Sequence, residues 1–221
     1  MHTVLTLLTT ADDLLHGRRV ATQPGRRTWL VLIAIVVSFG VLYGLVMGGF
    51  KLVPLQMVYS ALKLPLLLFA TFAISLPSFF VVGSLLGLRP DLGDALRRLL
   101  AAQATLAVVL VSLAPITAFM YASGIGYDAA KTFNGLMFLV ASVSAHFVLR
   151  RSYGELARRD RRHLTLLRGW LIAYATVGIQ MAWVLRPFIG RPGMAPTFFR
   201  EGAWSNAYIE VMGAVWRAIG G

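Results

Sequence analysis

Five apolar stretches, each about twenty residues long, are the feature of this sequence that most limits how the chain can fold. A bilayer-spanning helix needs about 20 consecutive apolar residues. In the hydrocarbon core, only helices and closed barrels satisfy all of their own backbone hydrogen bonds. The stretches cover residues 29–49, 64–87, 98–120, 129–149 and 167–186. They predict an all-α, polytopic integral membrane protein with five transmembrane helices.

Composition supports the same class and narrows the chemistry. Apolar residues make up 57% of the chain and charged residues 14%, whereas soluble domains have about 45–50% and about 25%. There is no cysteine, which excludes a disulfide scaffold and thiolate chemistry. The sequence has no nucleophile elbow, zincin helix, phosphate loop or pair of intramembrane aspartates. We therefore expect no enzymatic activity, no metal and no cofactor.

The basic residues predict the orientation of the helices. The chain has 21 Lys and Arg against 9 Asp and Glu, and such residues collect in cytoplasmic loops. With the N-terminus inside, fourteen of the 21 fall on the cytoplasmic side and seven on the other. This predicts a protein of the cell inner (plasma) membrane with a cytoplasmic N-terminus and an extracytoplasmic C-terminus. The arginine-rich loop from Arg150 to Arg168 then faces anionic lipid headgroups, and no nucleic acid partner is needed.

Amphipathic segments flank the five-span domain of residues 29–186 at both ends. In residues 1–28 and 187–221, apolar residues recur at helical spacing, which predicts helices lying in the membrane interface. The alternative for each is docking to another protein. The N-terminal stripe comprises Val4, Leu7, Leu8, Ala11, Leu14 and Leu15. The C-terminal stripe comprises Trp204, Tyr208, Val211, Met212, Val215, Trp216 and Ile219.

A row of glycines is the most specific motif. Gly40, Gly44 and Gly48 are spaced four apart in the first span, and Gly83 and Gly87 repeat the spacing in the second. Small residues stacked on one helix face let two backbones approach closely in lipid. We expect these glycines to pack helices together, either within the chain or against a second protein.

Polar residues near the ends of the spans are expected to form two layers. No Asp, Glu, Lys or Arg lies near the middle of any predicted span, which disfavours an ion pump. Interhelical hydrogen bonding is the simplest role for each layer, and a ligand pocket is the alternative. Arg186 either reaches toward headgroups or pairs with Asp128. The outer cluster is Asp128, Lys131, Asn134, Gln180 and Arg186, and the inner cluster is Gln103, His146 and Tyr174.

Several local motifs resemble those of a group of bacterial polytopic membrane proteins over about residues 29–210. They include Leu76-Pro77-Ser78-Phe79-Phe80, Leu113-Ala114-Pro115 and Trp183-Val184-Leu185-Arg186-Pro187-Phe188-Ile189-Gly190. The span number and orientation are also similar to those of Ypt-interacting (YIP-type) proteins, which implies a non-enzymatic membrane scaffold. No Asp-Leu-Tyr-Gly-Pro motif precedes the first span, so GTPase binding is not implied.

Three functions therefore remain open. The first is a non-catalytic scaffold or accessory subunit with protein partners in the membrane, or a homo-oligomer, which fits the glycine faces and the terminal stripes. The second is a transporter or channel for a small molecule or lipid, which requires the outer polar residues to line a cavity. The third is an intramembrane enzyme of unrecognised type acting through His146, Asp128 and Arg186.

Overall fold

The chain is all-helical in the part that the structure describes. The computed structural model describes residues 6, 9–13, 25–209, 212 and 216, and no strand occurs among them. The elements are α2 (Arg26–Gly48), the 3-10 turn η2 (Gly49–Lys51), α3 (Pro54–Leu85), the 3-10 turn η3 (Arg89–Asp91), α4 (Leu92–Ala122), α5 (Tyr127–Arg159) and α6 (Arg162–Val184). The predicted all-α class is confirmed for the described residues.

Four helical stretches are long and apolar enough to cross a membrane. They are Arg26–Lys51, Pro54–Leu85, Arg89–Ala122 and Tyr127–Arg159. The stretch predicted as a fifth span, residues 167–186, forms most of α6, but α6 is not among the four. Arg168 and Gln180 lower its mean hydropathy. The number of five spans is therefore not confirmed.

The helices extend beyond the predicted spans because polar residues continue them past the apolar core. α5 ends at Arg159 rather than at residue 149, and α3 begins at Pro54 rather than at residue 64. Pro54 occupies the first helical position, where its missing N–H costs nothing. The earlier start places Lys63 inside the helix, although the sequence pattern placed it just outside a span. Pro65 and Pro77 lie within α3 and do not break it.

Tight turns make consecutive helices antiparallel. After α3, Gly87 adopts a positive φ of 75°, and Leu88 N–H donates to Gly83 O at 2.9 Å. This is the hydrogen bond of a glycine-terminated helix. Gly87 thus serves the turn rather than a helix contact. Gly124, also with a positive φ, follows α4.

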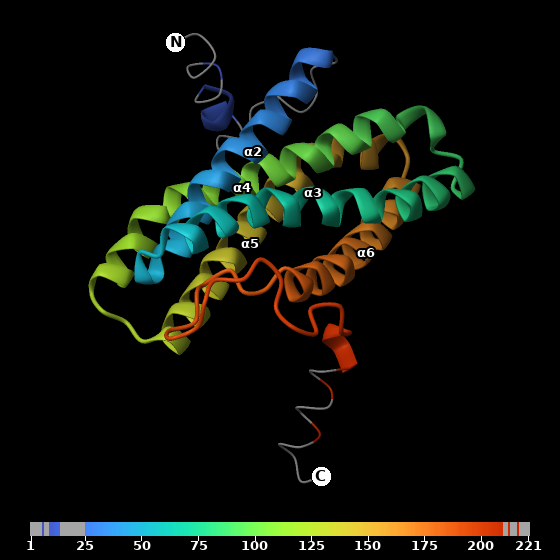
Figure 1. Ribbon diagram of the computed structural model, residues 1–221. Helices are drawn as coiled ribbons and strands as arrows, with labels where there is room; N and C mark the ends of the chain where they lie inside the picture. Colours follow the sequence, from blue (N-terminus) through green and yellow to red (C-terminus); the bar gives the residue numbers. More distant parts are fainter. Residues whose placement is uncertain (1–5, 7–8, 14–24, 210–211, 213–215, 217–221) are drawn as a thin grey trace.

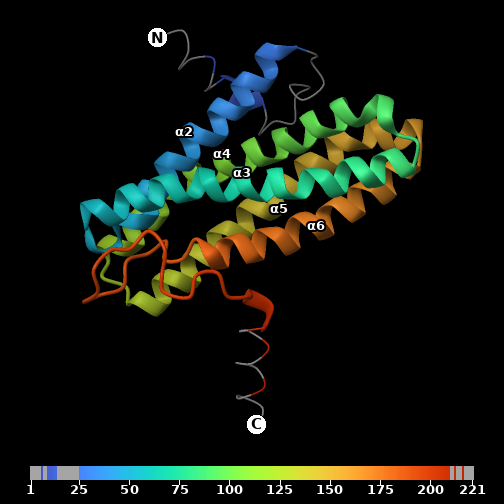
Figure 2. The same cartoon turned by 45° about the vertical axis from the view of Figure 1, so that its right-hand side comes forward.

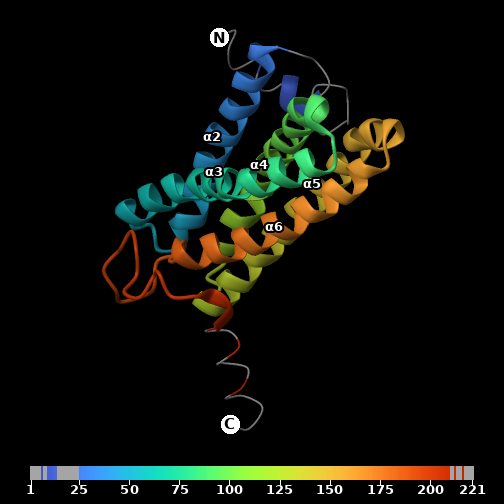
Figure 3. The same ribbon diagram turned by 90° about the vertical axis from the view of Figure 1, so that its right-hand side faces the viewer.

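The five long helices pack in the spatial order α6, α3, α2, α4, α5 (Figure 1). α2 contacts α3 and α4 extensively, α4 packs on α5, and α6 packs on α3. α2 crosses its neighbours obliquely (Figures 2 and 3). α5 and α6 share few contacts, although a short turn joins them. We call the end of the bundle that holds η3 and the α5–α6 turn the arginine end.

The glycine face of α2 is used inside the chain. A Cβ on Gly44 would lie 2.5 Å from Ser60 O and 2.7 Å from Ala61 Cα, and one on Gly48 would lie 2.8 Å from Gln56 O. At Gly40 the nearest atom is Pro65 Cγ, at 3.2 Å. Since these neighbours belong to α3, the glycines bring two helices of the same chain together.

The terminal stripes lie mostly outside the described residues. Of the N-terminal stripe only Ala11 is described, and its side chain is buried. Of the C-terminal stripe, Trp204, Tyr208, Met212 and Trp216 are described, and all four are exposed.

Candidate functional site

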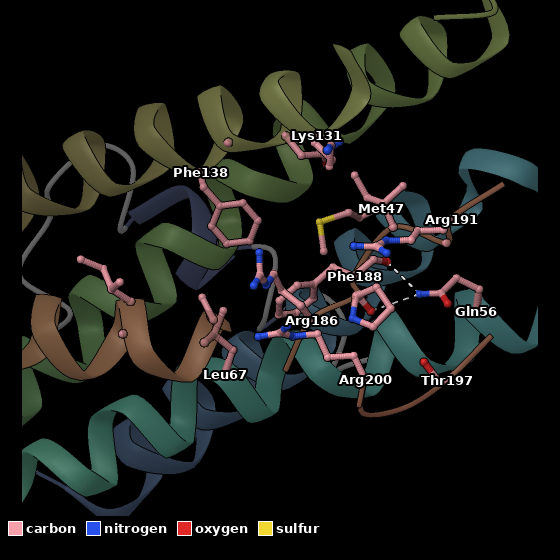
Figure 4. Close-up of a pocket in the computed structure, with 18 of the residues that line it drawn as sticks. Met47, Gln56, Leu67, Lys131, Phe138, Arg186, Phe188, Arg191, Thr197 and Arg200 are labelled. Atoms are coloured by element: carbon pink, nitrogen blue, oxygen red, sulfur yellow. Dashed lines mark hydrogen bonds between the residues drawn. The ribbon is translucent and has the colours of Figure 1, made fainter. Parts of the chain in front are cut away.

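A cavity of about 980 Å³ lies between α5 and α6, two helices that share few contacts with each other. Its walls come from α3, α5, α6 and the segment 186–201 that follows α6 (Figure 4). Met47 of α2 and Leu106 of α4 complete the lining. Ligand pockets in proteins are commonly about 300–1,000 Å³, so the space is large enough for a sizeable ligand.

One end of this cavity is cationic. Lys131 of α5 and Arg186, Arg191 and Arg200 of the segment line it, with Glu201 as the acidic lining residue. Figure 4 shows Arg186 and Arg200 together near Phe188. We refer to these four basic side chains as the cationic end.

Trp183 positions two of the arginines. The guanidinium carbon of Arg186 lies 3.5 Å from the centre of its indole, and that of Arg200 lies 4.6 Å away. Cation–π contacts of this kind fix a guanidinium without using its N–H groups. The indole is itself held by a 3.0 Å hydrogen bond from Nε1 to Ser205 Oγ.

The rest of the lining is mainly apolar. Leu67 and Leu68 of α3, Leu106 of α4, Phe138 of α5 and Ile179 of α6 line it. Small residues on α5 and α6 leave the space open. They are Gly135, Ser142, Ala175, Gly178 and Ala182.

Three lining residues have buried polar atoms without a hydrogen-bond partner in the described part of the chain. These atoms are Gln56 Oε1, Thr71 Oγ1, and Nε and Nη2 of Arg200. An unsatisfied buried polar group costs about 1–3 kcal/mol. Native proteins usually satisfy such groups with water, an ion or a ligand. Gln56 and Arg200 lie near the cationic end (Figure 4), whereas Thr71 lies roughly 22 Å along α3 from Gln56.

Three residues of α3 hold the segment in place. Gln56, Ser60 and Lys63 are spaced at i, i+4 and i+7, so they share one face of the helix. Gln56 Nε2 donates to Phe188 O at 3.0 Å, and Ser60 Oγ donates to the same oxygen. Lys63 Nζ donates to Pro187 O at 2.7 Å and to Thr197 O at 3.4 Å. We call these three residues the α3 clamp.

The α3 clamp is buried, and the sequence analysis did not identify it as a site. Gln56 is 1% exposed, and Ser60 and Lys63 are completely buried. The ammonium of Lys63 also lies 5.0 Å from the centre of the Phe198 ring. A lysine spaced with Gln and Ser along one helix face was the available signal.

α6 holds the chain just beyond that segment, at residues 205–208. Gln180 Nε2 donates to Ser205 O at 3.1 Å, and Gln180 Oε1 accepts from Ala207 N–H at 2.9 Å. Tyr208 Oη donates to Thr176 O at 2.7 Å. Gln180 therefore anchors the chain beyond α6, and these hydrogen bonds do not join it to Asn134.

The other members of the predicted outer cluster lie on α5 and at the end of α6. Asp128 pairs with Lys131 at 2.6 Å rather than with Arg186. Asn134 Nδ2 donates to Tyr121 Oη at 2.6 Å, and Asn134 Oδ1 accepts from Tyr43 Oη at 3.2 Å. Lys131, Asn134 and Arg186 all line the cavity.

Two members of the predicted inner cluster meet beside the cavity. Gln103 Nε2 donates to Tyr174 Oη at 2.9 Å and to Leu68 O at 3.2 Å. Tyr174 lines the cavity. His146 is half-buried on α5 and takes no part in these hydrogen bonds.

A second polar cluster lies at the arginine end and includes none of the predicted site residues. His163 Nε2 lies 3.2 Å from Asp91 Oδ2, and the histidine side chain is completely buried. Arg98 pairs with Glu155 at 3.0 Å and also donates to Ser152 O. These contacts join η3, α4, α5 and α6, so the cluster fixes the turns at this end.

Comparison of the chain with protein-family models, with curated proteins and with solved structures found no match.

Proposed function

We propose that this chain is an integral membrane protein that holds one lipid-like amphiphile in the cavity between α5 and α6. The observation that carries the proposal is the division of the lining into an apolar part and a cationic end. A hydrocarbon tail fits the apolar part, and a polar head fits the end where Gln56 and Arg200 have unsatisfied atoms. This is the lipid-handling alternative among the three functions predicted from sequence.

The dimensions of the cavity support a lipidic ligand. Its lining on α6 runs from Tyr174 to Ala182, which is roughly 12 Å at 1.5 Å per residue. On α5 it runs from Tyr127 to Ser142, or roughly 22 Å. Half of a bilayer's hydrocarbon core is about 15 Å thick. The lengths of the lining on the two helices therefore lie on either side of the depth of one leaflet.

In this proposal α6 is the fifth span. Its 23 residues make a helix about 35 Å long, which is enough to cross a hydrocarbon core of about 30 Å. It lies along α3, which is itself long and apolar enough to cross. The excess of basic residues places the arginine end in the cytoplasm. The cationic end of the cavity then faces the extracytoplasmic leaflet.

Cysteine labelling tests this orientation. Gly93 at the arginine end and Ser123 at the opposite end are both exposed, and a side chain at Gly93 meets no atom within 4 Å. In intact cells, an impermeant maleimide should label the Ser123→Cys variant and leave the Gly93→Cys variant unlabelled until the cells are permeabilised. The reverse pattern would contradict the proposed orientation.

Filling the cavity tests ligand binding. Gly135 lines the cavity, and a Cβ there meets no atom within 4 Å. We expect native mass spectrometry of the purified parent to detect a bound lipid, and the Gly135→Trp variant to lose it. Gly154→Trp is the matched control, because Gly154 is also on α5, also has no atom within 4 Å of its Cβ position, and does not line the cavity.

The change in Tm when lipid is added gives an expected size for the effect of binding. A ligand present at 100 times its Kd stabilises by about 2.7 kcal/mol, which raises the Tm of a protein of this size by roughly 5–10 °C. The parent and Gly154→Trp should show this rise with a bound lipid, and Gly135→Trp should not. Equal lipid binding by all three proteins would contradict the proposal.

An accessory subunit is a second candidate, because the region after α6 exposes large apolar side chains. Trp204, Ile209, Met212 and Trp216 are each at least 70% exposed. In this case, purification in a mild detergent should yield a stable stoichiometric protein partner, and alanine at Trp204 and Trp216 should release it. Retention of the partner by that double variant would count against this surface as the contact.

A further inference from the structure

We infer that the ligand's head is a phosphate group, and that Arg200 is its principal binding residue. This inference rests on the proposed lipid-like ligand and identifies the class of its headgroup. Three features of the cationic end support it: the unpaired nitrogens of Arg200, the charges around them, and the stacking of the guanidinium on Trp183.

The free atoms of Arg200 have the geometry of an anion-binding edge. Nε and Nη2 are buried, and neither has a hydrogen-bond partner among the described residues. These two nitrogens form one side of the planar guanidinium, and their parallel N–H groups match two oxygens of a phosphate or carboxylate. A guanidinium is always charged in proteins. Burying these donors without an acceptor is costly, which points to an acidic ligand.

The guanidinium of Arg200 is already fixed before a ligand arrives. It lies 4.6 Å from the centre of the Trp183 ring, which Ser205 holds by a hydrogen bond to the indole nitrogen. Stacking on a ring uses the guanidinium face, and the N–H groups of the buried edge remain unpaired among the described residues. Binding therefore requires little additional ordering of the side chain, which favours affinity.

The surrounding charges favour phosphate over a single carboxylate. Arg186, Arg191 and Arg200 line this end together with Glu201. Lys131 also lines it, but its ammonium lies 2.6 Å from Asp128. Counting Lys131 with Asp128 as neutral leaves three arginines against one glutamate. A phosphate monoester carries about −1.5 to −2 charges and three acceptor oxygens, so it can engage more than one arginine.

Three water-soluble probes separate the head from the tail. Dioctanoyl phosphatidic acid has both parts, dioctanoylglycerol has the tails alone, and inorganic phosphate has the anion alone. We expect the purified protein in detergent to bind dioctanoyl phosphatidic acid most tightly by calorimetry. Arg200→Gln should weaken that binding about 10- to 100-fold, the effect of losing a charge-assisted hydrogen bond. It should leave dioctanoylglycerol binding unchanged.

Two further variants guard against misfolding and general charge effects. Arg200→Lys keeps the charge and loses the planar edge, so its affinity should fall between the parent and Arg200→Gln. Arg158→Gln removes an exposed arginine outside the cavity and should bind like the parent. If Arg200→Gln fails to fold, Arg200→Lys still gives the test.

The outcomes distinguish this inference from the proposed function. If dioctanoylglycerol binds but dioctanoyl phosphatidic acid binds no better and Arg200→Gln changes neither, the phosphate head is wrong and the lipid cavity stands. If neither lipid binds, both fail. Inorganic phosphate that binds as tightly as the phospholipid, with the same dependence on Arg200, would overturn the lipid source. Decanoate is a fourth probe, with a carboxylate on a single tail; if it binds more tightly than dioctanoyl phosphatidic acid, it overturns phosphate in favour of a carboxylate.

Discussion

The α2–α3 contact and the α5–α6 side of the bundle both contain glycines, but the glycines have opposite structural effects in the two regions. On α2, Gly44 and Gly48 lie against the backbone of α3, and a Cβ at either position would come within 2.8 Å of backbone atoms. On α5, Gly135 faces open space, and on α6 a Cβ at Gly178 makes only ordinary contact with Thr71. Small residues remove space between two helices in one region and create it in the other.

This difference shows that a glycine's role depends on what faces it. A small residue allows close approach only when a helix stands opposite. Where the opposing helix packs elsewhere, as α6 packs on α3 rather than on α5, the same residue type leaves a cavity. The glycine row of α2 is occupied within the chain, so it no longer supports docking to a partner.

Replacing Gly44 should have the largest effect of any single change in this comparison. The Gly44→Leu side chain would meet Ser60 O and Ala61 Cα, so α2 and α3 must separate. Overpacking costs about 1–3 kcal/mol, and a rigid backbone contact should place this variant at or above about 3 kcal/mol. We expect a Tm at least about 6 °C lower in detergent, or no accumulation. Gly49→Ala is the control, because its nearest neighbour is the flexible end of Met57, at 3.7 Å; equal loss in both would refute the argument.

Lys63→Met should loosen the segment that lines the cavity between α5 and α6 without disturbing the α2–α3 contact. The substitution removes the donor that Pro187 O and Thr197 O share, and a lost buried hydrogen bond costs about 1–3 kcal/mol. Amide hydrogen exchange in residues 185–206 should accelerate by about 5- to 150-fold, while exchange in α2 stays the same. Lys51→Met, at an exposed lysine, should change neither. Unchanged protection of the segment would show that the α3 clamp does not hold it.

Gly135→Ala should stabilise the protein, in contrast to any larger residue at Gly44. The new methyl group meets no atom within 4 Å, and alanine is favoured over glycine inside a helix by about 0.5–1 kcal/mol. A rise in Tm of roughly 1–4 °C is expected. A fall in Tm would mean that another part of the protein closes on α5 at this position.

Asp128→Ala should have the smallest effect. Its partner Lys131 is on the same helix three residues later, and the carboxylate side chain is 92% exposed. Exposed pairs of this kind contribute little to stability, so Tm should change by less than about 1 °C. An additional test combines it with Arg186→Ala: the two changes should add, since the carboxylate pairs with Lys131. Clear non-additivity would indicate that Asp128 and Arg186 act together.

The sequence predicted the class of the fold better than its site, and the reason is the range of the interactions. Apolar runs are local, so an all-helical chain with long apolar helices follows from them directly. The α3 clamp depends on residues 56–63 meeting residues 187–197, and no periodicity reports on a contact across that separation. Lys63 was misplaced because a hydropathy window ends where a charged residue begins, although the helix continues.

The partners of Gln180 also could not be predicted from its position in the sequence. The sequence analysis grouped it with Asn134 in the outer cluster, because both lie near the same end of their predicted spans. Depth alone does not determine the direction of a side chain, and Gln180 hydrogen-bonds to Ser205 and Ala207. Gln103 and Tyr174 were also grouped by depth, and their helices bring the two side chains within hydrogen-bond distance.

Residues 186–201 are synthesised after all five long helices, which affects how the cavity forms during biosynthesis. Translation delivers α2 to α6 before residues 186–201, and folding proceeds from the N-terminal side as the chain emerges. A nascent chain arrested before residue 186 would therefore carry the apolar wall from α3, α5 and α6 but none of the three arginines that line the cavity. During that interval the groove is lined mainly by apolar side chains, and the arrival of the segment adds its three arginines.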